Sequence, residues 1–96
     1  GRARRRPAHV DHRRLVLARV LLFGPLRDLA GWRERTVDGA ESLSALKAFL
    51  TAEDPALGAA LSAPGVQVAL DQAIVRGDAT LAGRSEVAFL PPMSGG

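Results

Sequence analysis

The chain has 96 residues, which gives room for one domain with a modest hydrophobic core but not for a deep active site of many residues. It contains no cysteine, no apolar run near the roughly 18 residues of a membrane span and no signal-peptide pattern, so we expect a cytoplasmic protein without disulfides, thiol nucleophiles or a structural zinc site. The net charge of +3 is uneven, because 6 of the 13 basic side chains lie within the first 14 residues.

The N-terminal segment, residues 1–14, is rich in arginine and lacks interleaved aromatic residues and an amphipathic period. We expect a disordered basic extension. Six arginines can also bind nucleic acid through its phosphates, so a nucleic-acid-binding module stays open as a function of a different class. His9 and His12 lie in this segment with no further ligands nearby, and we expect no metal site.

The folded domain is expected over residues 15–90 and begins with a strand over residues 15–23, whose aliphatic side chains point to both faces. A short helix should follow, because Pro25 fits the first helical position and Gly31 fits a helix end. Residues 32–37 alternate weakly and predict a second strand.

The middle of the chain has helical spacing. Ser42 is suited to be the N-cap of the main helix, whose apolar stripe includes Leu43, Leu46 and Leu50. Asp54-Pro55 repeats the pattern of a cap followed by proline, which predicts a second short helical segment over residues 55–61.

The last third of the chain alternates with a period of two, as strands do. Residues 66–70 predict a strand, Asp71-Gln72 a turn and residues 73–75 a short partner strand, while residues 86–90 predict the final strand. The order of elements indicates an α+β fold in which a mixed sheet packs on one main helix.

Strands at the two ends of the domain carry apolar side chains on both faces, as Leu21 and Leu22 do in the first strand and Phe89 and Leu90 in the last. One main helix covers only one face of a sheet. The second face is therefore either closed by loops or exposed as an apolar patch that docks a partner.

Residues 91–96 form a predicted flexible tail. Pro91 and Pro92 favour an extended path, and Gly95 and Gly96 lack a Cβ, so they can enter a narrow cleft and present a free carboxylate. Taken alone, two glycines are more typical of a frayed terminus.

The chain resembles the small subunit of molybdopterin synthase, a ubiquitin-like β-grasp sulfur carrier of the ThiS/MoaD family. The likeness covers roughly residues 15–96 and lies in the order of elements, the opening Val20-Leu21-Leu22-Phe23-Gly24-Pro25-Leu26-Arg27-Asp28-Leu29 and the ending Glu86-Val87-Ala88-Phe89-Leu90-Pro91-Pro92-Met93-Ser94-Gly95-Gly96. Asp71 stands where such carriers often have asparagine, and both residue types tolerate the positive φ of a turn.

This resemblance implies that the chain is not an enzyme by itself and binds no cofactor permanently. A ubiquitin-activating-type adenylyltransferase would use ATP to convert the Gly96 carboxylate into an acyl-adenylate, and a sulfur donor would displace AMP to leave a thiocarboxylate. The large synthase subunit, in a heterotetramer, would take in the tail and supply the catalytic side chains. Sulfur would pass to cyclic pyranopterin monophosphate in molybdenum cofactor biosynthesis.

The resemblance also implies the site residues. Catalysis would use Gly96 with Gly95, and partner binding would use the interface positions Phe23, Ile74, Leu90, Pro91, Pro92 and Met93. Arg27 is either a polar contact at the rim of that interface or a solvated helix charge.

Two related functions stay open. Carriers that serve thiamine or cysteine synthesis also end in Gly-Gly, and a ubiquitin-like modifier would join the same terminus to target lysines. The Phe-Leu-Pro-Pro stem and the length of the domain favour the molybdopterin branch.

Overall fold

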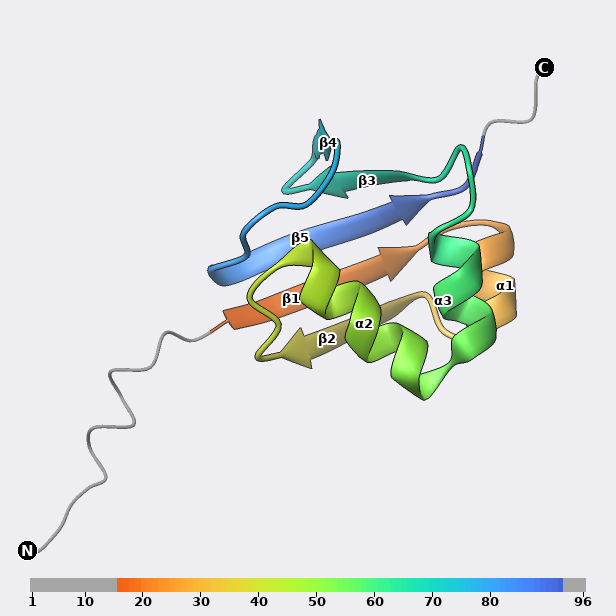
Figure 1. The fold of residues 1–96 in the computed structure, drawn as a ribbon, viewed down its shortest axis with the longest axis horizontal. Coiled ribbons are helices and arrows are strands. Elements are labelled where there is room, and N and C mark those ends of the chain that lie inside the picture. The colour runs from red at the N-terminus through yellow and green to blue at the C-terminus, as the bar shows by residue number, and fades with distance from the viewer. Residues whose placement is uncertain (1–15, 93–96) are drawn as a thin grey trace, which may run out of the picture.

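A computed structural model describes residues 16–92, and all the elements expected in that range are present (Figure 1). In chain order they are β1 (Val16–Leu22), α1 (Pro25–Ala30), β2 (Glu34–Asp38), α2 (Leu43–Glu53), α3 (Pro55–Leu61), β3 (Gln67–Leu70), β4 (Ala73–Val75) and β5 (Gly83–Leu90). The predicted basic extension over residues 1–14 and the last four residues, 93–96, lie outside the described residues.

The helices begin and end at the residues that the sequence indicates. Ser42 Oγ accepts a hydrogen bond from the Ala45 amide across 3.0 Å at the start of α2, and Asp54 Oδ1 accepts one from the Leu57 amide across 3.2 Å at the start of α3. Gly31 ends α1 with a left-handed φ of +84°. None of the helices within residues 16–92 has both the length and the apolar character needed to span a membrane.

The five strands form one mixed sheet in the order β2-β1-β5-β3-β4. The central strands β1 and β5 are parallel, with Val20 opposite Val87 and Leu22 opposite Phe89, and the other pairs are antiparallel. Since β5 lies between β1 and β3, the chain leaves the sheet from its middle (Figure 1).

The last strand is longer than its alternation predicts, because it begins at Gly83 and not at Glu86. Gly83 lies opposite Val16 and Ser85 lies opposite Ala18, so the polar start of β5 is held in the sheet by its pairing with β1. Pairing with a neighbouring strand outweighs the weak strand propensity of these residues.

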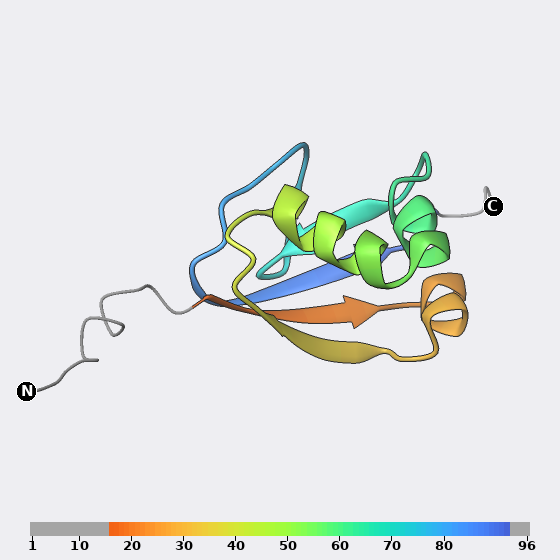
Figure 2. The same ribbon diagram turned by 60° about the horizontal axis from the view of Figure 1, so that its bottom comes forward.

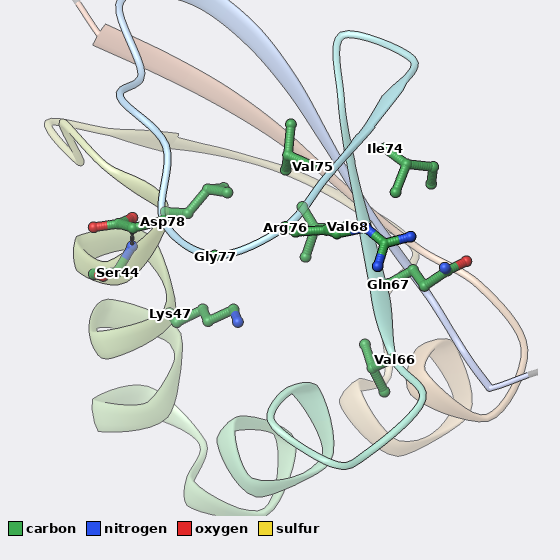
Figure 3. A pocket seen from close by; sticks show the side chains of 11 residues that line it. Ser44, Lys47, Val66, Gln67, Val68, Ile74, Val75, Arg76, Gly77 and Asp78 are labelled. Carbon is green, nitrogen blue, oxygen red and sulfur yellow. Dashed lines mark hydrogen bonds between the residues drawn. The ribbon is translucent and has the colours of Figure 1, made fainter.

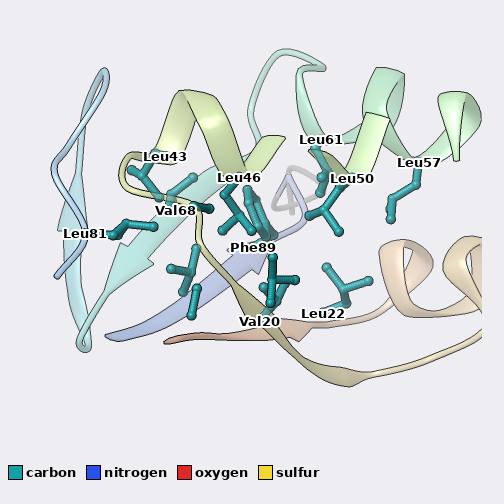
Figure 4. Close-up of a cluster of buried hydrophobic side chains, with 14 of the residues drawn as sticks. Val20, Leu22, Leu43, Leu46, Leu50, Leu57, Leu61, Val68, Leu81 and Phe89 are labelled. Carbon is teal, nitrogen blue, oxygen red and sulfur yellow. The ribbon is translucent and has the colours of Figure 1, made fainter. Parts of the chain in front are cut away.

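The core lies between the sheet and the helices. α2 and α3 lie across one face, and α1 closes the end of the core beside α3 (Figure 2). Leucines of the two helices point at the inward side chains of β1 and β5 (Figure 4), and the largest of these buried groups are Phe89, Leu22, Leu43, Leu46, Leu50, Leu57 and Leu61. Full burial of each such side chain contributes about 1.5–3 kcal/mol.

The predicted turn between β3 and β4 is confirmed. Asp71 and Gln72 have φ values of +49° and +72°, which are typical of a two-residue hairpin turn with both central residues at positive φ. The Asp71 amide donates to the Glu86 carbonyl, and Asp71 Oδ1 accepts from the Glu86 amide, each across 2.8 Å. The turn is thereby fastened to β5.

Candidate functional site

The candidate site lies on the outer face of the sheet, which is the face opposite α2 and α3. Side chains alternate along β1, so Val20 and Leu22 face the helices while Arg19 and Leu21 face outward. The strand register places one outward row across all five strands, consisting of Glu34, Leu21, Ala88, Ala69 and Ile74.

The apolar half of the outer face adjoins the C-terminal end of β5 and consists of Leu21, Phe23, Ala69, Ile74, Ala88 and Leu90. Phe23 and Ile74 keep 44% and 48% of their surface exposed, and Leu90 is half-buried. The loops of residues 16–92 therefore do not close this face. A patch of exposed large apolar side chains is typical of a surface that docks another protein. The predicted partner-binding residues Phe23, Ile74 and Leu90 share this patch, and their role in binding stays a prediction.

The other half of the outer face is charged. Arg19 Nε donates to Glu34 Oε2 across 2.6 Å, and Arg19 Nη1 lies 3.7 Å from Glu86 Oε1. The hydrogen bond with Glu34 raises the pKa of Arg19, and the same bond holds the pKa of Glu34 below its ordinary value. Because exposed ion pairs add little stability, these groups act mainly as a polar border beside the apolar half.

Arg27 stands on α1 at the edge of the apolar half. It lines a shallow hollow of about 250 Å³ together with Leu21, Phe23 and Arg33. Its Nε lies 3.7 Å from Asp28 Oδ1, and half of its side chain is exposed. The guanidinium is thus available beside Phe23, and its role as a rim contact stays a prediction.

The stem Pro91-Pro92 follows β5 directly. Two glycines from distant loops lie against it: a Cβ added at Gly24 would be 3.4 Å from Pro91 Cγ, and one added at Gly65 would be 2.9 Å from Pro92 Cβ. In the sequence these two glycines indicate only where one element ends and the next begins. Sequence analysis therefore does not predict their contact with the stem. The other predicted tail residues, Met93, Gly95 and Gly96, lie outside the described residues.

A second group that sequence analysis missed joins β2 to α2. The Arg35 guanidinium lies 5.5 Å from the centre of the Trp32 ring and 5.8 Å from that of Phe49, and it makes two hydrogen bonds to the Glu53 carboxylate, of 2.6 and 3.1 Å. These bonds raise the pKa of Arg35 and lower that of Glu53. The Arg35 cation thus contacts two aromatic rings and a carboxylate at once. These contacts hold β2 against α2, which accounts for the group as a structural one.

A hollow of about 340 Å³ lies between α2 and the β3–β4 hairpin (Figure 3). Lys47 and Arg76 bring positive charge to its lining, while Asp78 Oδ1 accepts hydrogen bonds from the Ser44 and Ala79 amides, each of 2.9 Å. These bonds, with that of Ser44 the strongest cause, hold the pKa of Asp78 below its ordinary value. Asp78 thus holds the segment after β4 against the start of α2. Residues 16–92 contain no group of three or more His, Cys, Asp or Glu side chains placed to hold a metal ion.

The sheet order, the parallel central strands and the main helix across one face define a ubiquitin-like β-grasp domain, and solved structures agree with this class. Small archaeal modifier protein 1 from Methanosarcina acetivorans matches with a TM-score of 0.74 at 24% identity, over 85% of this chain and 98% of that one. A putative molybdopterin converting factor subunit 1 from Pyrococcus furiosus matches with a TM-score of 0.69 at 21% identity, over 81% and 99%. A chain in the complex of subunits 1 and 2 of molybdopterin-converting factor from Helicobacter pylori 26695 matches with a TM-score of 0.62 at 21% identity, over 83% and 99%. The predicted fold class is confirmed.

The family follows from the sequence. The profile of the ThiS family matches residues 20–96, which is most of the chain and includes Gly95 and Gly96. The chain belongs to the ThiS family, and the predicted membership of the ThiS/MoaD family is confirmed. Comparison with curated protein sequences finds no match.

Proposed function

We propose that this chain is the sulfur carrier subunit of molybdopterin synthase. The observation that carries the proposal is the position of the apolar half of the outer face, beside the end of β5 from which the Gly-Gly terminus continues. A partner that docks there is placed to receive the terminus. The family match, which extends through Gly96, and the solved complex of subunits 1 and 2 of molybdopterin-converting factor support the same function.

The proposed chemistry uses the terminal carboxylate. A carboxylate is a poor electrophile, so its oxygen first attacks the α-phosphorus of ATP on an activating enzyme, releasing pyrophosphate and forming an acyl-adenylate at Gly96. Sulfide then attacks the carbonyl carbon and AMP leaves with the C–O bonding pair, which gives the thiocarboxylate. The thiocarboxylate sulfur then attacks a carbon of cyclic pyranopterin monophosphate and displaces an oxygen substituent, which leaves with its bonding pair, so that Gly96 and the precursor are joined by a thioester. Water hydrolyses this thioester, which restores the carboxylate and leaves the sulfur on the product as a thiol. Because the first step consumes ATP, we place the reaction in the cytoplasm.

In this proposal the domain binds and the partners catalyse. The large subunit contributes the catalytic side chains and covers the apolar half, in particular Phe23, Ile74 and Leu90. Burying the exposed half of such a side chain stabilises a complex by on the order of 1 kcal/mol. The same surface would serve the activating enzyme, because both partners must reach the same terminus, and the two would then bind in turn.

The test is mass spectrometry of the intact chain after incubation with an activating enzyme from the same organism, ATP and sulfide. We expect one oxygen to be replaced by sulfur at Gly96, and the loaded chain, mixed with a large subunit, to convert the pyranopterin precursor. A chain that gains no sulfur under conditions in which AMP is formed would contradict the carrier function. A chain that gains sulfur but does not support conversion would instead indicate a carrier for thiamine or cysteine synthesis.

A second candidate, a ubiquitin-like protein modifier, is favoured by the match to small archaeal modifier protein 1. The acyl-adenylate is also the electrophile that such a modifier needs, since a lysine amine can displace AMP and form an isopeptide bond. Digestion of proteins from cells that express the chain would distinguish the two. Because Arg84 is the last basic residue of the chain, trypsin would leave residues 85–96 attached to each modified lysine. Lysines bearing this remnant would show modification, and their absence beside a thiocarboxylate pool would favour the carrier alone.

A further inference from the structure

Two glycines flank the stem because of the sheet register. Leu22 lies opposite Phe89 in the parallel pair and Gln67 lies opposite Leu90 in the antiparallel pair. Continuing both registers by two residues brings Gly24 beside Pro91 and Gly65 beside Pro92, which agrees with the close approach of these residues. In Figure 1 the end of β5 accordingly passes between the β1–α1 connection and the α3–β3 connection.

The stem fits between its neighbours because the glycines lack side chains. A Cβ at Gly65 would lie 2.9 Å from Pro92 Cβ and 3.3 Å from Pro92 Cγ, distances at which either the loop or the stem must move. Pro91 and Pro92 have no amide hydrogen, so they end the hydrogen-bonded ladder of β5 and fix their own φ angles. A rigid stem with no ladder bonds is then positioned by van der Waals contact with the two loops.

We propose that Gly24 and Gly65 are positioning residues, which form a seat for Pro91 and Pro92 and set the direction in which the C-terminal residues leave the sheet. This rests on the proposed function, in which the terminus must reach the reaction centre of a partner. The four residues after Pro92 span at most about 14 Å. A stem that tilts changes where Gly96 can arrive, and misplacement by about 1 Å can cost a hundredfold in rate.

A seated stem also lowers the cost of binding. Residues that are already ordered in the free chain need not lose conformational entropy when a partner takes in the terminus. The seat adjoins the apolar half through Phe23 and Leu90, which directly precede Gly24 and Pro91 in the sequence. A partner that covers the apolar half therefore meets a stem with a defined starting point and direction.

The obvious alternative is that these positions are glycine only because of their backbone. Gly24 and Gly65 have φ values of +56° and +89°, and any other residue is strained there. The chain provides matched controls: Gly39 has a φ of +92° and Gly83 a φ of +60°, and a Cβ at either would have nothing within 4 Å. Alanine at a control glycine carries the backbone strain without touching the stem.

The experiment compares Gly65→Ala with Gly39→Ala in the full chain. Both variants should lose stability through the strained φ, and Gly65→Ala should lose more because its methyl group strikes Pro92. The rate of sulfur loading at Gly96 should fall at least about tenfold more in Gly65→Ala. NMR of the unmodified chain should show cross-peaks between Gly65 and Pro92 that persist in Gly39→Ala. In Gly65→Ala the signals of Pro91 and Pro92 should shift.

A double-mutant cycle then tests whether the effect passes through the stem. Pro92→Gly removes the ring that the added methyl group of Gly65→Ala would strike. Adding Gly65→Ala to the Pro92→Gly chain should therefore slow loading no more than adding Gly39→Ala does. Equal loading rates for Gly65→Ala and Gly39→Ala, or an effect of Gly65→Ala that is unchanged in the Pro92→Gly chain, would overturn the proposal.

Two further outcomes also test the proposed seat. If Gly65→Ala does not fold, the milder pair Gly24→Ala and Gly83→Ala takes its place, with the same comparison of loading rates and the Pro91 signals as readout. If the unmodified chain gains no sulfur, the proposed function fails, and the seat is judged by NMR alone: stem signals that move with Gly65→Ala but not with Gly39→Ala support it, and signals that move with neither overturn it.

Discussion

The two faces of the sheet are built from neighbouring residues of the same strands, yet they differ in how far they are covered. In β5, Phe89 points at the helices and is fully buried, while Leu90 points outward and is only half-buried. The inner face is closed by α2 and α3, whereas the outer face has an apolar half that residues 16–92 leave open. Under the proposed function, the inner face determines stability and the outer face determines binding, so a substitution on one face should change one property with little effect on the other.

The largest functional effect is expected from deletion of Gly96. The truncated chain would still end in a carboxylate on Gly95, but about 3.5 Å short of its place in a partner. Sulfur loading and precursor conversion should fall by orders of magnitude. Stability should change by less than about 0.5 kcal/mol, because every contact of residues 16–92 is kept.

A chain with one alanine added after Gly96 is the matched control, since it retains all 96 residues and hides the carboxylate in an amide. It should be equally inactive and equally stable. Normal sulfur loading of either variant, measured by mass spectrometry, would refute the role of Gly96.

The largest effect on stability is expected on the inner face. Phe89→Ala removes a fully buried ring and should lower the free energy of unfolding by about 3–5 kcal/mol. Leu90→Ala, one residue later on the outer face, should cost about 1 kcal/mol or less. Urea unfolding of the two variants measures the difference, and equal losses would mean that the two faces are not distinct.

The outer face should instead decide binding. Ile74→Asp leaves an exposed carboxylate in the free chain and should keep the fold, but docking would strip that carboxylate of water without a partner. We expect affinity for the large subunit to fall at least about thirtyfold, since burying an unpaired charge costs about 2 kcal/mol or more. Isothermal titration calorimetry gives the affinity.

A matched pair of phenylalanines sharpens this test. Phe23 and Phe49 are 44% and 41% exposed, but Phe23 belongs to the apolar half while Phe49 lies on α2, on the other side of the sheet. Phe23→Ala should weaken binding to the large subunit, and Phe49→Ala should not. Equal weakening by both would place the docking surface elsewhere.

Sequence analysis correctly predicted those features of the fold that depend on residues close together in the chain. The caps at Ser42 and Asp54 and the helix end at Gly31 depend on residues close in sequence, so their positions were predicted correctly. The two apolar faces of β1 also followed from alternation, since the period of a strand is fixed. The family match extends through Gly95 and Gly96, and the role of these two residues stays a prediction.

Contacts between distant segments could not be predicted in this way. The start of β5 at Gly83 depends on β1, and the bonds between Asp71 and Glu86 depend on a register that no local pattern encodes. Gly65 reads as a loop residue in the sequence, and its approach to Pro92 arises only because β5 lies beside β3. Each of these contacts depends on which strands lie side by side in the sheet, and the local sequence pattern does not contain that information.

The smallest effect is expected in the charged half of the outer face. The hydrogen bond from Arg19 holds the pKa of Glu34 below its ordinary value of 4.5, so the folded state favours the ionised carboxylate. This contribution to stability is present above the pKa of the unfolded chain and is lost as the pH falls from about 4.5 through the lower folded value. Glu34→Gln should therefore lower stability slightly at pH 7 and have no effect at a pH below the pKa of Glu34 in the folded state.

Because the Arg19–Glu34 pair is exposed, the stability difference between Glu34→Gln and the unmodified chain at pH 7 should shrink further in 1 M salt, where charges are screened within about 3 Å. Thermal unfolding of both chains at the two pH values and two salt concentrations measures it. If Glu34→Gln still loses stability at low pH, Glu34 stabilises the fold through packing and not through its charge. The charged half of the outer face would then contribute to stability in the same way as the inner face.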